Sequence, residues 1–194
     1  MKQLYRSKVA QLFGWLWLVF AVLNVWDLIN RGTMPSALIA GAALGVITVL
    51  VFLMALRPAV IAEEGGVLVR NPLKNAYIPW SEFGDVIVTS SIIIESGHTT
   101  VRCWTPQATA RERAKAAGRA AKAAASASAS KADRAAAELI GSRTHADWVA
   151  QQLTEMSVSR RETSSGQTRV TWSPTALAAV AVAIVLVVVT FIVA

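Results

Sequence analysis

The most regular spacing of charged side chains lies in an alanine-rich segment in the second half of the chain. Placed at 100° per residue, four basic residues of this segment fall within about 80° of arc on one helix face. This basic stripe consists of Arg111, Lys115, Arg119 and Lys122. It could contact phosphate groups on an anionic membrane or on a nucleic acid. The alternative is an exposed helical spacer, slightly favoured because the opposite face holds alanines with little apolar area to insert.

Residues that serve catalysis are sparse. The single cysteine, Cys103, lies in a strand-like run, and a small buried apolar side chain is the expected role. His98 follows a glycine in a turn, and His145 begins a helix with Asp147 close by, so both are expected in solvent. Phosphate-binding glycine loops, nucleophile motifs and metal-ligand spacings are not found. We therefore expect a protein that is not an enzyme and has no catalytic, metal-binding or cofactor-binding residues.

Composition indicates a membrane protein. Of the 194 residues, 54% are hydrophobic and only 16% are charged, against about a quarter in typical soluble domains. The uncharged residues concentrate in three blocks, which we predict to be transmembrane helices at residues 9–29, 35–56 and 174–194. The second block, at 1.5 Å rise per residue, would span about 33 Å. The first could instead be a cleaved signal peptide, but it is long for one and no small-residue cleavage site follows.

Basic residues near the predicted spans indicate the orientation. Residues 1–8 contain three bases and no acid, whereas at the far end of the first span Asp27 balances Arg31. Further bases flank the second and third spans: Arg57, Arg160, Arg161 and Arg169. Because basic residues favour the cytoplasmic side, we expect the N-terminus and residues 57–173 inside, with the loop at 30–34 outside. The net charge of +7 fits a polar region that faces an anionic leaflet.

Small residues recur at every fourth position of the second span. Ala37, Gly41 and Gly45 would line one helix face and allow close approach of a neighbouring backbone. A homo-oligomer could use this face, but the first helix of the same chain is already available. We favour packing within the chain.

The polar residues 57–104 read as a small antiparallel β domain. Short β-branched runs alternate with turn signals, such as Glu63-Glu64-Gly65-Gly66 and Asn71-Pro72, which give five or six strands. The expected domain core comprises Val67, Val69, Ile78, Trp80 and Phe83.

The same residues carry a resemblance. The order R-P, G-G-V-x-V-R-N-P and I-P-W-S-E-F, from Arg57 to Phe83, resembles the bacterial pleckstrin-homology-like family named after the mycobacterial low-molecular-weight protein antigen 6. The resemblance covers residues 57–104 and implies no catalytic residue. It implies a PH-like β barrel or sheet, which normally has seven strands and a C-terminal helix. The domain is therefore either a trimmed version of this fold or contains a strand that the sequence pattern does not show.

Between the β domain and the third span, three segments are distinguishable. Residues 105–141 read as an alanine-rich basic helical insertion that starts at Thr105-Pro106, and residues 157–173 as a polar linker. Residues 144–156 form an amphipathic helix capped by Thr144, the natural candidate for the helix that closes a pleckstrin-like barrel. The fold class is thus a membrane α-helical protein with a small antiparallel β domain and its closing helix between spans two and three.

Three functions remain open. The first is a membrane-anchored, non-catalytic module that docks a protein partner or lipid head groups. The second is weak nucleic-acid binding through the insertion, which has only seven bases against two acids between residues 111 and 134 and no base-reading groups. The third is an accessory subunit of a transporter, which finds no buried charge inside any span. We favour the first, with membrane lipids and an unidentified protein as partners, and disfavour nucleic acid.

Overall fold

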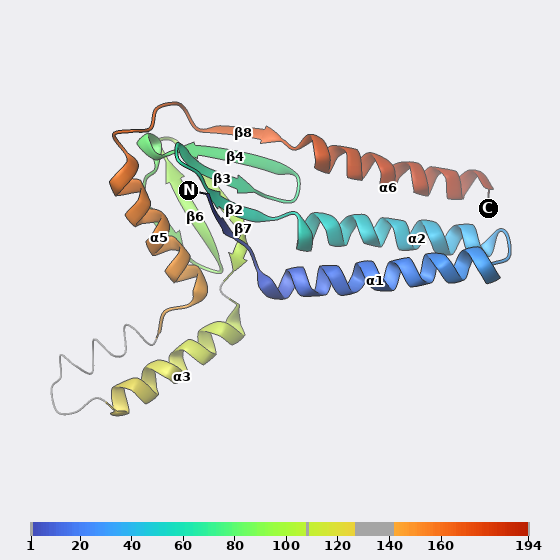
Figure 1. The fold of residues 1–194 in the computed structure, drawn as a ribbon, viewed down its shortest axis with the longest axis horizontal. Helices are drawn as coiled ribbons and strands as arrows, with labels where there is room; N and C mark the ends of the chain where they lie inside the picture. The colour runs from blue at the N-terminus through green and yellow to red at the C-terminus, as the bar shows by residue number, and fades with distance from the viewer. Residues whose placement is uncertain (1, 108, 127–141, 194) are drawn as a thin grey trace.

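The computed structural model describes residues 2–107, 109–126 and 142–193. Three long helices run side by side from one end of a β domain, and the N-terminus lies at the domain while the C-terminus lies at the far end of the helices (Figure 1). The helices are α1 (Lys8–Arg31), α2 (Ser36–Val51) with a π-helical turn at Phe52–Leu56, and α6 (Pro174–Val193). All three are long and apolar enough to cross a membrane. Among them α2 is central, since it packs against both α1 and α6.

The chain enters the β domain before the first helix. Strand β1 (Gln3–Tyr5) pairs antiparallel with β2 (Ala59–Ala62), so Gln3 lies opposite Ala62. The helical hairpin of α1 and α2 is therefore inserted between two neighbouring strands of one sheet. Residues 1–8 had been expected to form only a basic tail. Three residues are too few to show the period-two pattern of a strand, and the pairing depends on β2.

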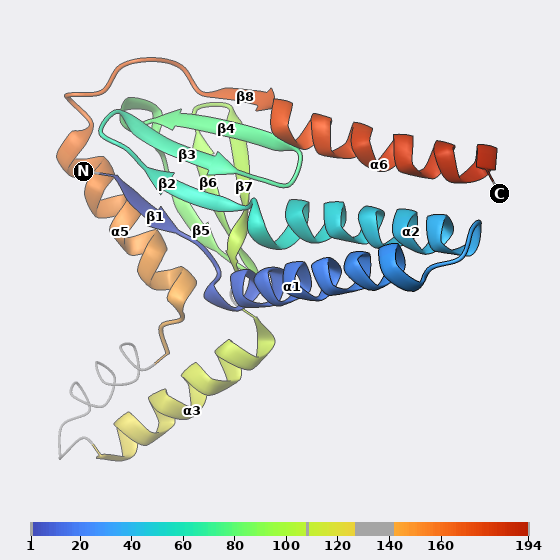
Figure 2. The ribbon, with the colours of Figure 1, turned by 45° about the vertical axis from the view of Figure 1, so that its right-hand side comes forward.

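Two antiparallel sheets make up the domain (Figure 2). The first has the order β1-β2-β3-β4-β8, with β3 at Gly66–Arg70, β4 at Lys74–Pro79 and β8 at Arg169–Trp172. The second has the order β5-β6-β7, with β5 at Val86–Val88, β6 at Ser91–Ser96 and β7 at Thr99–Gln107. A short 3₁₀ turn, Trp80–Glu82, connects the two sheets.

The hydrophobic core lies between the sheets and is closed by α5 (His145–Arg160). Thr144 caps α5 through a reciprocal capping box with Asp147, and Val149 and Leu153 of α5 are fully buried. Tyr5 of β1 joins this core, and its hydroxyl contacts Gln152 Oε1 of α5 at 2.5 Å. The helix runs four residues beyond the predicted end at 156, because Ser157 is still buried on the same face.

The segment expected to be a polar linker, 157–173, is instead part of the domain. The Ser164 hydroxyl donates to the carbonyl of Gly65 at 2.5 Å and accepts from the backbone N–H of Trp80 at 3.0 Å. The N–H of Thr168 donates to Glu82 Oε2 at 2.7 Å, and β8 then pairs with β4. A serine-rich composition resembles that of a linker, but its hydroxyls here satisfy buried backbone groups.

The alanine-rich segment starts later than Thr105-Pro106, because both residues belong to β7. Helix α3 (Ala110–Ser126) begins after Thr109, whose hydroxyl accepts from the N–H of Glu112 while Glu112 Oε2 accepts from the N–H of Thr109. This pair is a capping box. Residues 127–141 of the predicted insertion, including its expected stop at Gly141, lie outside the described residues.

Candidate functional site

The basic stripe lies on α3, and its four side chains are exposed. It does not face one uniform surface. Arg111 and Lys115 border a groove of about 590 Å³ that α3 forms with the start of α1 and the end of α2. Lys115, Arg119 and Lys122 border a second groove of about 710 Å³ beside the start of α5. The structure therefore divides the stripe between a groove beside the long helices α1 and α2 and a groove beside α5.

The buried face of α3 differs from the one expected from the helical wheel. Ala116 and Ala120 are buried at 1% and 4% exposure, whereas Ala114, Ala117 and Ala121, which lie opposite the basic stripe on a helical wheel, are exposed. An all-alanine helix has no large side chain to fix which face turns inward, so the wheel alone could not decide it. On the stripe side, Arg119 Nη2 donates to the carbonyl of Arg143 at 3.3 Å.

A second group of bases gathers where the helices leave the β domain. Arg6 lies between β1 and α1, Arg57 between α2 and β2, and Arg70 is the last residue of β3. All three line one pocket of about 390 Å³. Its other lining residues are Phe52, Leu56, Asn75, Ser173, Pro174 and Thr175. We call this the junction pocket.

Arg57 is the most buried base of the junction pocket, with 8% of its surface exposed. Its Nη2 donates to Asn75 Oδ1 at 2.6 Å, while its buried Nη1 has no acceptor. Desolvation, followed by the nearby charge of Arg70, lowers the pKa of Arg57 below its ordinary value. Arg6 Nε is also buried without a hydrogen-bond acceptor.

Sequence patterns predict only part of this site. Arg57 is a base that flanks the second predicted span, and Arg6 is one of the three bases in residues 1–8. Arg70 is the arginine of the V-x-V-R-N-P run in the β domain. Their convergence was missed because it requires β1 to pair with β2 and β3 to follow in the same sheet.

The small residues of α2 contact helices of the same chain. A Cβ atom placed on Gly41 would come 4.0 Å from Leu28 Cδ1 of α1, and one on Gly45 would come 2.6 Å from Leu186 Cδ1 of α6. Ala37 lies beside Gly32, at the turn between α1 and α2. The small face thus contacts two helices of the same chain, α1 and α6, whereas within the chain the sequence predicts only α1 as its partner.

The predicted core residues Val67, Val69, Ile78, Trp80 and Phe83 all belong to the buried cluster. Trp80 is fully buried, and its Nε1 donates to the carbonyl of Glu63 at 3.0 Å. Cys103 is fully buried as well, and burial raises the pKa of its thiol to about 12. At neutral pH the thiol is therefore protonated.

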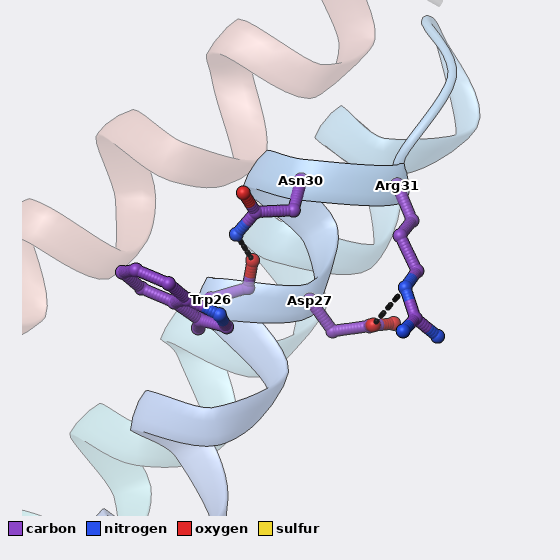
Figure 3. A network of polar contacts seen from close by, with 4 residues as sticks. All are labelled: Trp26, Asp27, Asn30 and Arg31. Atoms are coloured by element: carbon purple, nitrogen blue, oxygen red, sulfur yellow. Dashed lines mark hydrogen bonds and ion pairs between the residues drawn. The ribbon is translucent and has the colours of Figure 1, made fainter.

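The polar side chains at the far end of α1 form local contacts within the helix. Asp27 Oδ1 pairs with Arg31 Nε at 3.5 Å, and Asn30 Nδ2 donates to the carbonyl of Trp26 at 2.7 Å (Figure 3). The ion pair and the Trp26 ring point to opposite sides of the helix (Figure 3). Asp27 is therefore explained by its exposed i,i+4 ion pair with Arg31 and needs no role in ion conduction. In the part of the chain that the structure describes, no three His, Cys, Asp or Glu side chains are grouped to hold a metal ion.

Comparison with protein-family models, with curated proteins and with solved structures finds no match to this chain.

Proposed function

We propose that this protein is an integral membrane protein that presents a cytoplasmic, pleckstrin-homology-like interaction module and has no catalytic role. The proposal rests mainly on how few residues connect the strands of the β domain to the three long helices. Arg6 and Ser7 separate β1 from α1, Arg57 and Pro58 separate α2 from β2, and Ser173 alone separates β8 from α6. Connections this short leave little freedom of orientation, so the domain would be held against the membrane surface.

The surfaces of the three helices support a membrane location. Large apolar side chains are exposed along each of them, including Phe13, Trp15, Ile184 and Phe191 at half or more of their surface. Exposed apolar area of this extent is unfavourable in water, whereas hydrocarbon covers it at no cost. The bases Lys2, Arg6 and Arg57 at the domain end support a cytoplasmic domain.

The strand arrangement supports the pleckstrin-like part of the proposal. Strands β1 to β4 follow one another in a first sheet, β5 to β7 form a second, and α5 closes the space between them. Seven strands and a closing helix agree in number with what the resemblance implies, and β1 adds one strand to those expected from residues 57–104. Strand β8 is an addition that leads into α6.

The location of the open grooves on the domain surface supports an interaction role. The space between the sheets is filled by side chains such as Trp80, Ile78 and Leu153, all fully buried. Open grooves lie beside α3 and at the helix junctions, and bases outnumber acids along them, with Glu112 as the acid of the two grooves beside α3. Lipid head groups or an acidic protein segment would suit such surfaces.

Membrane extraction tests the proposal. Isolated membranes that contain the protein are washed with alkaline carbonate, which releases peripheral proteins, and then treated with a neutral detergent. We expect the protein to stay in the pellet after the wash and to enter the supernatant only with detergent. Its release by the wash alone would show that the three helices do not span the bilayer.

A further inference from the structure

The junction pocket contains three guanidinium groups and no carboxylate among its lining residues. We propose that it binds a phosphate group, and that this phosphate belongs to the head group of an anionic lipid in the leaflet facing the β domain. The phosphate site follows from the pocket itself, whereas its lipid source rests on the membrane location proposed above.

The positive charge of the three arginines is not balanced by nearby acidic side chains in the described part of the chain. Within the described residues, Arg6, Arg57 and Arg70 form no ion pair with an acidic side chain. Lys2 pairs with Glu63 at 2.8 Å, away from the pocket. Removing a charge from water without a partner is costly, so clustered arginines of this kind are stabilised when an anion joins them.

Two of the arginines in the junction pocket have N–H donors without an acceptor. Arg57 is more than nine-tenths buried and lines the pocket, and its Nη1 has no acceptor. Arg6 Nε is buried without an acceptor in the same pocket. Guanidinium groups present planar forks of N–H donors that match the oxygens of phosphate. Both side chains line the pocket, so a phosphate there would lie beside two arginines whose hydrogen bonds are incomplete.

Two helix ends lie beside the pocket, and their partial charges oppose each other. Ser173 caps the N-terminus of α6, its hydroxyl accepting from the N–H of Ala176 at 3.4 Å, and the partial positive charge of that helix end adds to the three arginines. The end of α2 contributes an opposing partial negative charge near Arg57. The two partial charges, each about half of one elementary charge, nearly cancel, so the positive charge of the pocket comes from the three arginines.

The two sides of the pocket differ in a way that fits a lipid. Phe52, Leu56 and Pro174 belong to the helix side, whereas Arg70 and Asn75 belong to the sheet side. In a membrane-anchored protein this boundary lies at the level of the head groups. The arginines would then hold the phosphate while the apolar side chains contact the first carbons of the lipid.

Thermal unfolding of the full-length protein in neutral detergent, followed by tryptophan fluorescence, provides the test. The additions are phosphatidylglycerol in mixed micelles, phosphatidylcholine in mixed micelles, and inorganic phosphate. We expect phosphatidylglycerol to raise the Tm in a concentration-dependent way, while phosphatidylcholine, whose phosphate is balanced by its own cation, has little effect.

The variant Arg70→Gln, compared with Arg161→Gln, assigns the effect to the pocket. Arg161 is exposed at the end of α5, so its substitution removes the same charge elsewhere. We expect Arg70→Gln to raise the Tm without lipid, because it relieves repulsion with Arg57, and to weaken the response to phosphatidylglycerol roughly tenfold or more. Arg161→Gln should change neither quantity. If Arg70→Gln fails to fold, Arg6→Gln takes its place, and Arg70→Lys should keep part of the response.

Each other outcome is decisive. An equal rise in Tm with inorganic phosphate alone would support the phosphate site and overturn the lipid source. No rise with any addition, or equal responses of Arg70→Gln and Arg161→Gln, would overturn the site. A protein that carbonate releases from membranes but that phosphate still stabilises would refute the membrane location while leaving the phosphate site intact.

Discussion

Trp104 Nε1 donates a hydrogen bond to the backbone carbonyl of Met54 at 3.2 Å, which ties strand β7 to the last turn of α2. Met54 lies in the π-helical turn, where the donor to its carbonyl would be the N–H five residues later, but that residue is Ala59 of strand β2, and Pro58 before it has no N–H. The indole therefore satisfies a carbonyl that has no donor within the helix. The bond fixes the β domain on the helical hairpin.

Replacing Trp104 by phenylalanine tests this link. The ring remains but the donor is lost, so we expect the free energy of unfolding in detergent to fall by about 1 kcal/mol. Trp148→Phe is the control, since Trp148 is similarly exposed and packs through its ring against Tyr5 and His145. Equal losses in the two variants would show that the Met54 bond contributes nothing specific.

Truncation of Trp80 should be far more damaging. Its ring is fully buried, packs against Phe83 at 5.4 Å between centroids, and donates to the carbonyl of Glu63. We expect Trp80→Ala to lose about 3–5 kcal/mol, measured by chemical unfolding of the full-length protein. Trp148→Ala, which removes a half-exposed ring, should lose clearly less. A Trp80→Ala protein as stable as wild type would mean that the two sheets do not close on this ring.

Bulk added to the small face of α2 should reveal its partners. Gly45→Ile meets Leu186 of α6 directly, whereas Gly41→Ile starts with a 4.0 Å clearance from Leu28 of α1. We expect the Gly45 variant to be the less stable by about 1–3 kcal/mol, with the mass of the detergent-solubilised particle unchanged in both. Loss of a dimer on either substitution, with unaltered unfolding, would instead assign the face to a homo-oligomer.

Cysteine labelling should establish the orientation. With an impermeant thiol reagent on intact cells, we expect Thr33→Cys to react and Glu162→Cys to react only after lysis, because positions 33 and 162 are both exposed on opposite ends of the spans. Ser164 is unsuitable as the inner position, since its hydroxyl is engaged in the core. The opposite labelling pattern would place the β domain outside.

Wild-type protein supplies the background for that experiment. Cys103 is fully buried and the pKa of its thiol is raised to about 12, so the reactive thiolate is scarce below that pH. We expect no alkylation of the folded protein between pH 7 and 9 and complete alkylation in denaturant. Rapid reaction of the native protein would contradict the burial of β7.

The basic stripe predicts a charge-dependent contact of α3 with the bilayer. In nanodiscs we expect amide exchange of residues 110–126 to slow on anionic lipid at low salt and less at physiological salt, where the Debye length is about 8 Å. Replacing Arg111, Lys115, Arg119 and Lys122 together by glutamine should abolish the difference. Lys115→Gln should weaken it more than Arg113→Gln, because Arg113 lies on the opposite face and contacts the carbonyl of Thr89. Equal exchange on neutral and anionic lipid would leave α3 a spacer.

Local patterns were sufficient for much of this protein. Composition, periodicity or turn residues within a short window predict several elements. These are the three long helices, the hairpins from Ala59 to Pro79 and the capped helix at Thr144. The core positions of β3 and β4 follow from alternation, because side chains on a strand point to opposite faces.

Only the tertiary structure decided how distant segments meet. Strand β1 is three residues long and β8 four, too short to show a period, and each exists because a partner strand offers unpaired backbone groups. The junction pocket depends on the same pairing. Arg6, Arg57 and Arg70 become neighbours because the α1–α2 hairpin returns the chain to its starting end, where β1 and β2 join. Arg6 and Arg70 are 64 residues apart in the sequence, and they meet only because the chain returns along this path. The residues around each arginine do not encode the contact.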